Sequence, residues 1–239
     1  MNESTINSKH LCRPMDIAWV FSDQLQEGEV QLLFVQDGKN YVKSVGLKES
    51  FEQLINEQPN LASNVVMVLI HPGSSSERRT IYHPHGENHQ AFVNFFYEEL
   101  LPDVKGKMEA IDLTIAKMGS ISDSLGAVAN LYLAMKKPDL WSHILLQSAA
   151  FEPFMLEDAH EHIQNVNWNI YQVVGEQEKE FTSPISGKTL FIYENNQKFR
   201  DLFKEKGISL AYYEEDESHR WVFWKKDLPR ALRFFIENQ

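Results

Sequence analysis

Residues 113–135 of this 239-residue chain read LTIAKMGSISDSLGAVANLYLAM, and this stretch decides the fold. An apolar run leads into SDSLG at residues 122–126, and a segment rich in Ala and Leu follows at once. A strand that turns sharply into a helix at a serine is the context of a nucleophile elbow, where neighbouring residues must be small to relieve crowding. Ser122 and Gly126 are the small residues on either side of Ser124, which makes Ser124 the candidate nucleophile.

Ser124 has a second interpretation, because serine is also favoured as the N-cap of a helix. Ser120 and Ser122 compete as nucleophiles, but neither stands in the S-x-G relation to the turn. A helix that begins here would place a partial positive charge and unbonded backbone N–H groups near the Ser124 hydroxyl. On the pentapeptide alone, both interpretations of Ser124 stay open.

Along the whole chain, apolar runs alternate with longer amphipathic stretches. Strand-like runs cover residues 16–21, 30–35, 65–71, 113–118, 143–147, 169–174 and 209–213, and helix-like stretches cover residues 47–57, 90–104, 125–135, 197–206 and 221–238. Several runs are continuous Val, Ile and Leu, as in strands that are buried on both faces of a parallel sheet. The alternation predicts an α/β fold, a three-layer α/β/α sandwich with a mostly parallel central sheet.

We expect a single domain over residues 13–239, preceded by an N-terminal tail at residues 1–12. A chain of 239 residues with 43% hydrophobic and 24% charged residues fits one sizeable globular domain. Residues 73–88 and 176–187 fit regular structure least, and loops of this length often carry function. We expect residues 73–88 and 150–164 to build the substrate pocket.

The charge and the apolar pattern exclude several classes of partner. A net charge of -11 argues against nucleic acid or an anionic membrane surface as the main partner. No apolar run approaches the roughly 20 residues of a membrane helix, and the polar N-terminus lacks the apolar stretch of a signal peptide. The single cysteine, Cys12, excludes an intramolecular disulfide. We therefore expect a cytoplasmic protein that acts on a small molecule.

A serine nucleophile needs a base, because its hydroxyl is weakly nucleophilic by itself. In enzymes with this elbow, the acid and then the histidine follow the serine along the chain. Of nine histidines, only His219 lies late, between the strand-like run 209–213 and the last helical stretch. The acid is expected after the run 169–174, which gives Glu178 as first choice and Glu176 as second. The alternative for His219 is an exposed loop histidine in an acidic stretch. The alternative for Glu178 and Glu176 is that they are glutamates on a solvated face.

Two histidine clusters invite a zinc interpretation, since clustered histidines can bind zinc. They are His83, His85 and His89 in HPHGENH, and His160 and His162 in HEH. Neither cluster has a known ligand spacing, so we interpret these histidines as solvated loop residues and predict no metal site. The GSSS sequence at residues 73–76 lacks the Gly-Lys-Ser/Thr ending of a phosphate loop.

Four features together resemble the branch of the α/β-hydrolases that includes enterochelin esterases, esterase D and S-formylglutathione hydrolases. They are VQLLFVQDGKNY at residues 30–41; Arg79 to Pro84 with Phe92 and EELLP at residues 98–102; Ser124-Leu125-Gly126 with PDLW at residues 138–141 and Gln147-Ser148; and His219-Arg220-Trp221 with Trp224, Leu228 and Pro229. Their order covers nearly the whole chain from about residue 13. The chain departs from the branch at Ser122 and Ala127, where glycines are usual, and at Ile81-Tyr82, where an acidic residue is usual.

The resemblance implies hydrolysis of an ester, with Ser124, Glu178 and His219 as the catalytic triad and no cofactor. It also implies an oxyanion hole made of the Leu125 backbone N–H and one N–H of the turn Asp37-Gly38-Lys39, for which we take Gly38. Arg79 is the candidate to bind an acidic or catecholate-like substrate, or else a surface ion-pair partner.

The predicted reaction is therefore cleavage of a carboxylic ester or thioester through an acyl-enzyme, on a siderophore-type or small acyl ester. Acyl transfer to another alcohol stays open. The alternative from a different class is a non-catalytic protein of the same fold that binds a ligand or partner, because fold alone does not determine activity.

Overall fold

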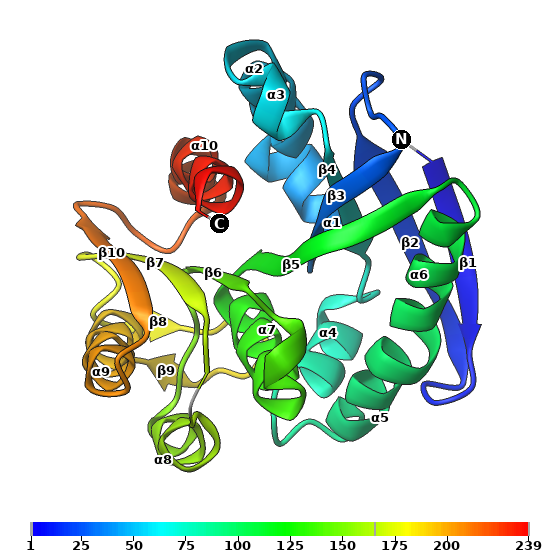
Figure 1. Ribbon diagram of the computed structural model, residues 1–239. Coiled ribbons are helices and arrows are strands. Elements are labelled where there is room, and N and C mark those ends of the chain that lie inside the picture. The colour runs from blue at the N-terminus through cyan, green and yellow to red at the C-terminus, as the bar shows by residue number, and fades with distance from the viewer. Residues whose placement is uncertain (1, 165, 239) are drawn as a thin grey trace.

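A computed structural model describes residues 2–164 and 166–238 of the protein. These residues form one eight-stranded sheet in the order β1-β2-β4-β3-β5-β6-β7-β10 (Figure 1). The strands are β1 (Asn2–Ser8), β2 (Arg13–Phe21), β3 (Gly28–Val35), β4 (Val65–Ile70), β5 (Leu113–Asp123), β6 (His143–Gln147), β7 (Asn169–Gly175) and β10 (Ser209–Glu215). All pairings from β4 to β10 are parallel, and only β1 and β2 run antiparallel to their neighbours. The predicted α/β fold with a mostly parallel sheet is confirmed.

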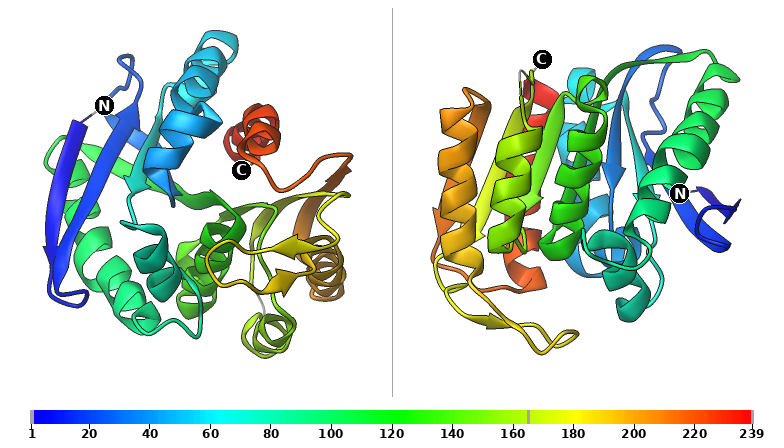
Figure 2. Two further views of the ribbon diagram at one scale, coloured as in Figure 1. Left: turned by 180° about the vertical axis from the view of Figure 1, so that it is seen from behind. Right: turned by 90° about the horizontal axis from the view of Figure 1, so that it is seen from below.

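Helices cover both faces of the sheet, which gives the three layers visible in Figures 1 and 2. One face carries α1 (Gly38–Asn40), the π-helical segment η1 (Tyr41–Val45), α2 (Leu47–Glu57), α3 (Pro59–Ala62) and α10 (Trp221–Glu237). The other carries α4 (Ser75–Tyr82), α5 (His89–Asn94), the π-helical segment η2 (Phe95–Leu100), α6 (Leu101–Glu109), α7 (Ser124–Lys136), α8 (Pro153–His162) and α9 (Ile192–Glu205). A 3-10 turn, η3 (Pro138–Leu140), follows α7.

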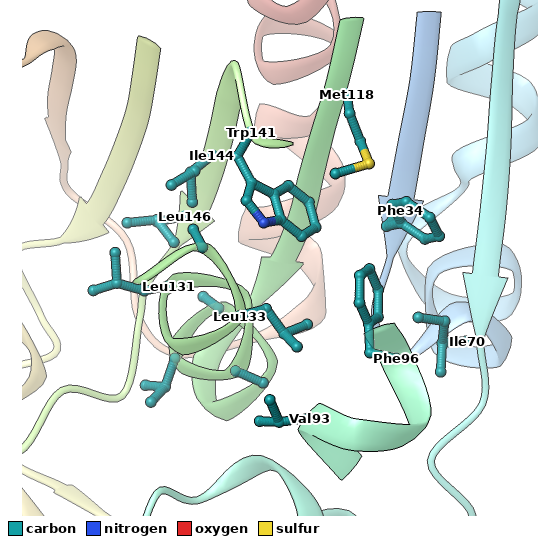
Figure 3. Packing of buried hydrophobic residues seen from close by; sticks show 14 of the residues in the cluster. Phe34, Ile70, Val93, Phe96, Met118, Leu131, Leu133, Trp141, Ile144 and Leu146 are labelled. Atoms are coloured by element: carbon teal, nitrogen blue, oxygen red, sulfur yellow. The ribbon is translucent and has the colours of Figure 1, made fainter. Parts of the chain in front are cut away.

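Strand β3 shows why the apolar runs become central strands. Its successive side chains point to opposite faces, so Leu32 and Phe34 enter one core cluster while Leu33 and Val35 enter the other. In the larger cluster Phe34 packs edge-on against Phe96 with ring centroids 4.8 Å apart (Figure 3). A strand that is buried on both faces is apolar at most of its positions, which is the nearly continuous pattern seen in the sequence.

Residues 1–12 were expected to form a tail, and the structure corrects this. Residues 2–8 form β1, which pairs antiparallel with β2 along its whole length, for example Thr5 with Asp16. The strand is polar and mostly exposed at the edge of the sheet. Its one large apolar residue, Ile6, is partly buried and packs against the core. An edge strand with so little apolar alternation gives almost no signal in a hydropathy pattern.

The two regions expected as irregular loops contain regular structure. Residues 73–88 include α4, whose N-terminus is a capping box in which Ser74 and Glu77 satisfy each other's backbone N–H groups. Residues 176–187 include β8 (Phe181–Thr182), which pairs with β9 (Thr189–Leu190) in a small hairpin. The predicted helix at residues 90–104 is α5, η2 and the start of α6 in sequence. Within the described residues, no helix combines the length and the apolar character needed to cross a membrane.

Candidate active site

Ser124 lies at the junction of β5 and α7, with Asp123 as the last strand residue. Its φ of 52° is in the left-handed region, which is strained for a residue with a side chain and is typical of functional turns. Gly126 explains how the turn closes, since an added Cβ there would lie 2.2 Å from Ser122 Oγ. Two small side chains around a strained serine are the geometry expected of a nucleophile elbow.

Ser124, His219 and Glu178 form a continuous hydrogen-bonded chain. Ser124 Oγ lies 2.9 Å from His219 Nε2, and His219 Nδ1 lies 2.9 Å from Glu178 Oε2. The side chains of His219 and Glu178 are buried, with 7% and 0% of their surface exposed. Because the carboxylate accepts the Nδ1 proton, Nε2 is left as the acceptor for the serine hydroxyl. The structure thus brings together the three residues that the resemblance implied.

Glu178 and His219 lie on the loops that follow the neighbouring strands β7 and β10, and backbone hydrogen bonds join these two loops. After β7, the backbone N–H of Glu176 donates to the Glu215 carbonyl at 2.8 Å, and that of Gln177 donates to the Glu217 carbonyl at 3.1 Å. These bonds join the acid loop to the loop that carries His219. The Glu176 side chain is exposed, so the structure places the first choice, Glu178, against the imidazole, and not the second.

Ser148 is a further residue of this site that the sequence reasoning did not assign. It follows β6, is fully buried, and has a left-handed φ of 47°. Its hydroxyl donates to Glu178 Oε1 at 2.7 Å and accepts the Trp224 Nε1–H at 3.0 Å. The backbone N–H of Gly175 also donates to Glu178 Oε1, at 3.2 Å. The only signal in the sequence was the Gln147-Ser148 pair quoted for the resemblance.

The expected oxyanion donors lie on two segments at the carboxyl end of the sheet. Leu125 is the second residue of α7, and Gly38 begins α1 directly after the turn that follows β3. Within the described residues, neither backbone N–H donates to a protein acceptor. An added Cβ on Gly38 would lie 2.5 Å from Leu69 Cβ and 2.9 Å from His71 Cε1, so Leu69 and His71 pack tightly against the Gly38 backbone.

A buried charge cluster lies behind the elbow. Arg78 on α4 makes a two-pronged ion pair with Asp37, with Nη2 2.7 Å from Oδ2. Asp123 is buried nearby with its Oδ1 unpartnered among the described residues. Burial and the Asp37 carboxylate raise the pKa of Asp123 to about 8, although Arg78 acts in the opposite direction. Asp123 is therefore a neutral carboxylic acid at neutral pH.

A cavity of about 380 Å³ lies beside α4 and α8. Its lining includes the predicted substrate residue Arg79 and other residues of the two segments expected to build the pocket, together with Lys188, which lies outside both. The residues from the two segments are Ser76, Arg79, Thr80, His83, His85, Gly86, Glu87, Glu152 and Phe154. The backbone N–H of Ala150 donates to the Ser124 carbonyl at 3.1 Å, which connects the segment before α8 to the elbow.

The histidines around this cavity correct one expectation. His83 is not a solvated loop residue, because it is only 8% exposed and its Nε2 lies 2.7 Å from Glu152 Oε1. Its Nδ1 accepts the His85 backbone N–H at 3.1 Å, and burial lowers its pKa, so His83 is neutral. No three His, Cys, Asp or Glu side chains in residues 2–164 and 166–238 are grouped so that they could hold a metal ion.

The fold and the site define an α/β-hydrolase with an elbow serine, a histidine and a buried glutamate in one hydrogen-bonded chain. The chain belongs to the family described as "Putative esterase", whose model matches residues 8–235. This confirms the family resemblance seen in the sequence.

Comparisons with individual proteins agree with this membership. The chain is 24% identical over 202 residues to the uncharacterized protein YjcH of Bacillus subtilis (strain 168), covering 84% of this chain and 82% of that one. The structure is similar to enterochelin esterase from Shigella flexneri, with a TM-score of 0.76 and 18% identity over 99% of this chain. It is also similar to the siderophore hydrolase EstB from Aspergillus nidulans, with a TM-score of 0.69 and 15% identity over 99% of this chain and 94% of that one. The chain spans 58% of the length of the enterochelin esterase chain.

Proposed function

We propose that the protein hydrolyses a carboxylic ester through an acyl-enzyme on Ser124. The observation that carries the proposal is the hydrogen-bonded chain from Ser124 Oγ through the His219 imidazole to the buried Glu178, with 2.9 Å at each step. A serine in a strained elbow, an imidazole and a carboxylate in this order are the parts of a general-base mechanism. Membership of an esterase family supports the same reaction class.

In the first half-reaction, His219 Nε2 takes the Ser124 proton as Oγ attacks the carbonyl carbon of the ester. The resulting oxyanion is stabilised by the backbone N–H groups of Leu125 and Gly38, each worth roughly 3 kcal/mol in comparable sites. As the tetrahedral intermediate collapses, the imidazolium gives its proton to the departing alkoxide, and the acyl group stays on Ser124. Glu178 holds the imidazole in the required tautomer and stabilises the imidazolium.

In the second half-reaction, water takes the place of the alcohol. His219 removes a proton from the water as it attacks the acyl carbonyl, and the same two N–H groups receive the second oxyanion. Collapse of this intermediate returns the proton to Ser124 Oγ and releases the carboxylic acid. Another alcohol in place of water would give acyl transfer by the same steps.

For the substrate, we propose a siderophore-type or small acyl ester, with a thioester as a variant of the same chemistry. The similar solved structures named above are an enterochelin esterase and a siderophore hydrolase. Arg79 is one of the residues that line the cavity beside α8. Within the described residues, its guanidinium makes no hydrogen bond or ion pair. Such a cation suits an acidic or catecholate-like group of the substrate.

The test is intact-mass analysis after treatment with a fluorophosphonate, on the wild type and on Ser124→Ala, His219→Ala and Ser142→Ala. Ser142 is the control, because its hydroxyl is bonded to the Met118 carbonyl. We expect one adduct on the wild type and on Ser142→Ala, no adduct on Ser124→Ala, and labelling of His219→Ala slowed by about 10³-fold or more.

An adduct that persists on Ser124→Ala would contradict the assignment of the nucleophile. No adduct on the folded wild type would favour the other class, a non-catalytic protein that binds a ligand in the same fold.

A further inference from the structure

Arg78, the neighbour of the predicted substrate residue Arg79, makes a buried ion pair that the reaction scheme above does not use. Its Nε donates to both carboxylate oxygens of Asp37, at 2.7 and 2.9 Å, and its Nη2 donates to Oδ2 at 2.7 Å. The Asp37 side chain is fully buried and that of Arg78 is 15% exposed. Among the described residues, every hydrogen bond to this carboxylate comes from Arg78. Bonds of this kind are short, strong and directional.

Asp37 contacts both halves of the proposed oxyanion hole. Its backbone, with a left-handed φ of 56°, immediately precedes Gly38, and its carbonyl accepts the N–H groups of Asn40 and Tyr41 at 2.8 and 3.1 Å. Its carboxylate reaches the other half, since an added Cβ on Gly126 would lie 2.8 Å from Asp37 Oδ2. Gly126 is the residue after Leu125, so one side chain spans the two segments that carry the donors.

Helix α4, which carries Arg78, contacts the turn at Asp37 a second time through Tyr82. The backbone N–H of Asp37 points to Tyr82 Oη at 3.4 Å, and that hydroxyl donates to Gln36 Oε1 at 2.9 Å. On the opposite side, Leu69 and His71 pack against Gly38. A glycine has no side chain by which to be held, so its N–H direction depends on these neighbours. An oxyanion donor must lie about 2.7–3.1 Å from the oxygen it stabilises, so small displacements matter.

We propose that Arg78 is a positioning residue for the oxyanion hole. Through Asp37 it fixes the N–H of Gly38 relative to the N–H of Leu125, and this role rests on the proposed acyl-enzyme mechanism. An ion pair that only joins α4 to the sheet would contribute to stability and leave the chemistry of the bound ester unchanged. A positioning role instead predicts a loss in kcat with little change in KM, because the oxyanion exists only after attack.

The experiment compares p-nitrophenyl acetate with its thiono analogue, in which sulfur replaces the carbonyl oxygen. Sulfur is a poorer hydrogen-bond acceptor, so an intact oxyanion hole favours the oxygen ester. The variants are Arg78→Met and the double variant Arg78→Met/Asp37→Asn, in which no unpaired charge is left buried. The control is Arg230→Met, because Arg230 also holds a buried carboxylate, that of Asp227 at 2.7 Å, from helix α10 on the other face of the sheet.

We expect both Arg78 variants to lose about 10- to 100-fold in kcat with KM changed by less than about threefold, as for a donor displaced by a fraction of an ångström. Their preference for the oxygen ester should fall by about fivefold or more, while Arg230→Met keeps the wild-type preference. Thermal melts show whether each variant is folded.

Wild-type kcat and ester preference in the folded double variant would overturn the positioning role. So would a loss of kcat with an unchanged ester preference, because that pattern belongs to stability alone. A wild type that hydrolyses neither ester would overturn the proposed function itself, which distinguishes the two failures.

Discussion

At the residue scale, Asp123 is a carboxyl group with 1% of its surface exposed, one residue before Ser124. Its pKa of about 8 in the folded protein exceeds the ordinary value of 3.8. Between these two pH values the folded state holds a proton that the unfolded state has lost. The contribution of Asp123 to stability is therefore fully present below pH 3.8 and is lost as pH rises to about 8.

Asp123→Asn replaces the protonated acid by a neutral group of the same shape. We expect the variant to melt above the wild type at pH 8 by several degrees, at about 2–4 °C for each kcal/mol in a domain of this size. The difference should shrink towards pH 4. Melting temperatures of both proteins from pH 4 to pH 9 check this, and a constant difference over that range would contradict it.

Also at the residue scale, the sequence could single out Ser124 and His219 as candidates because each has a local context. The serine has small neighbours at fixed offsets, and the histidine is the only one placed between the last strand and the last helix. Arg78 could not be chosen over Arg79, because which of two adjacent helical residues faces the sheet depends on how α4 docks. Ser148 depends in the same way on two loops that meet only in the folded chain.

At the scale of elements, the loops after β7 and β10 act as one unit, and Gly175 lies where they touch. An added Cβ on Gly175 would lie 2.2 Å from the Glu217 carbonyl oxygen and 2.8 Å from Glu178 Oε1. We expect Gly175→Ala to push the two loops apart, lowering kcat by about 100-fold and stability by about 1–3 kcal/mol.

The control for Gly175→Ala is Gly106→Ala, because Gly106 is an exposed glycine in α6 with nothing within 4 Å of an added Cβ. Alanine there should stabilise the helix by about 0.5–1 kcal/mol and leave kcat unchanged. Steady-state kinetics and thermal melts measure both changes. Full activity in folded Gly175→Ala would show that the loops can separate without harm to the site.

Elements also show where prediction from sequence stops. The central strands and α7 were found because burial makes most of their residues apolar. Helix α4 was taken for a loop although Ser74 and Glu77 form a capping box, because its eight residues carry little apolar periodicity. The hairpin β8–β9 has two residues in each strand, which is too short for any periodicity to be read.

At the scale of the whole molecule, β1 is the edge strand of the sheet and pairs with the outer side of β2. Deletion of residues 2–8 would leave β2 with unpaired backbone groups along its outer side. We expect the truncated protein to melt several degrees lower and to self-associate, since exposed edges pair with other chains. Its kcat should stay close to that of the wild type, because β2, β4 and β3 lie between this edge and β5.

Ile6→Ser is the matched variant, because it removes the apolar contact of β1 but keeps the paired edge. It should lower the melting temperature without self-association. Size-exclusion chromatography and thermal melts separate the two effects. A truncated protein that stays monomeric would contradict the role of β1 as edge protection.

The order of the site residues along the chain bears on how the protein is made. The serine and its proposed base are separated by 95 positions and joined only through the folded sheet. During synthesis, Ser124 and its neighbours in sequence are made before Glu178 and, later, His219. A growing chain therefore has a serine without its partners for much of its translation. On the proposed mechanism, such an intermediate attacks esters far more slowly than the finished protein until β10 and the loop after it have left the ribosome.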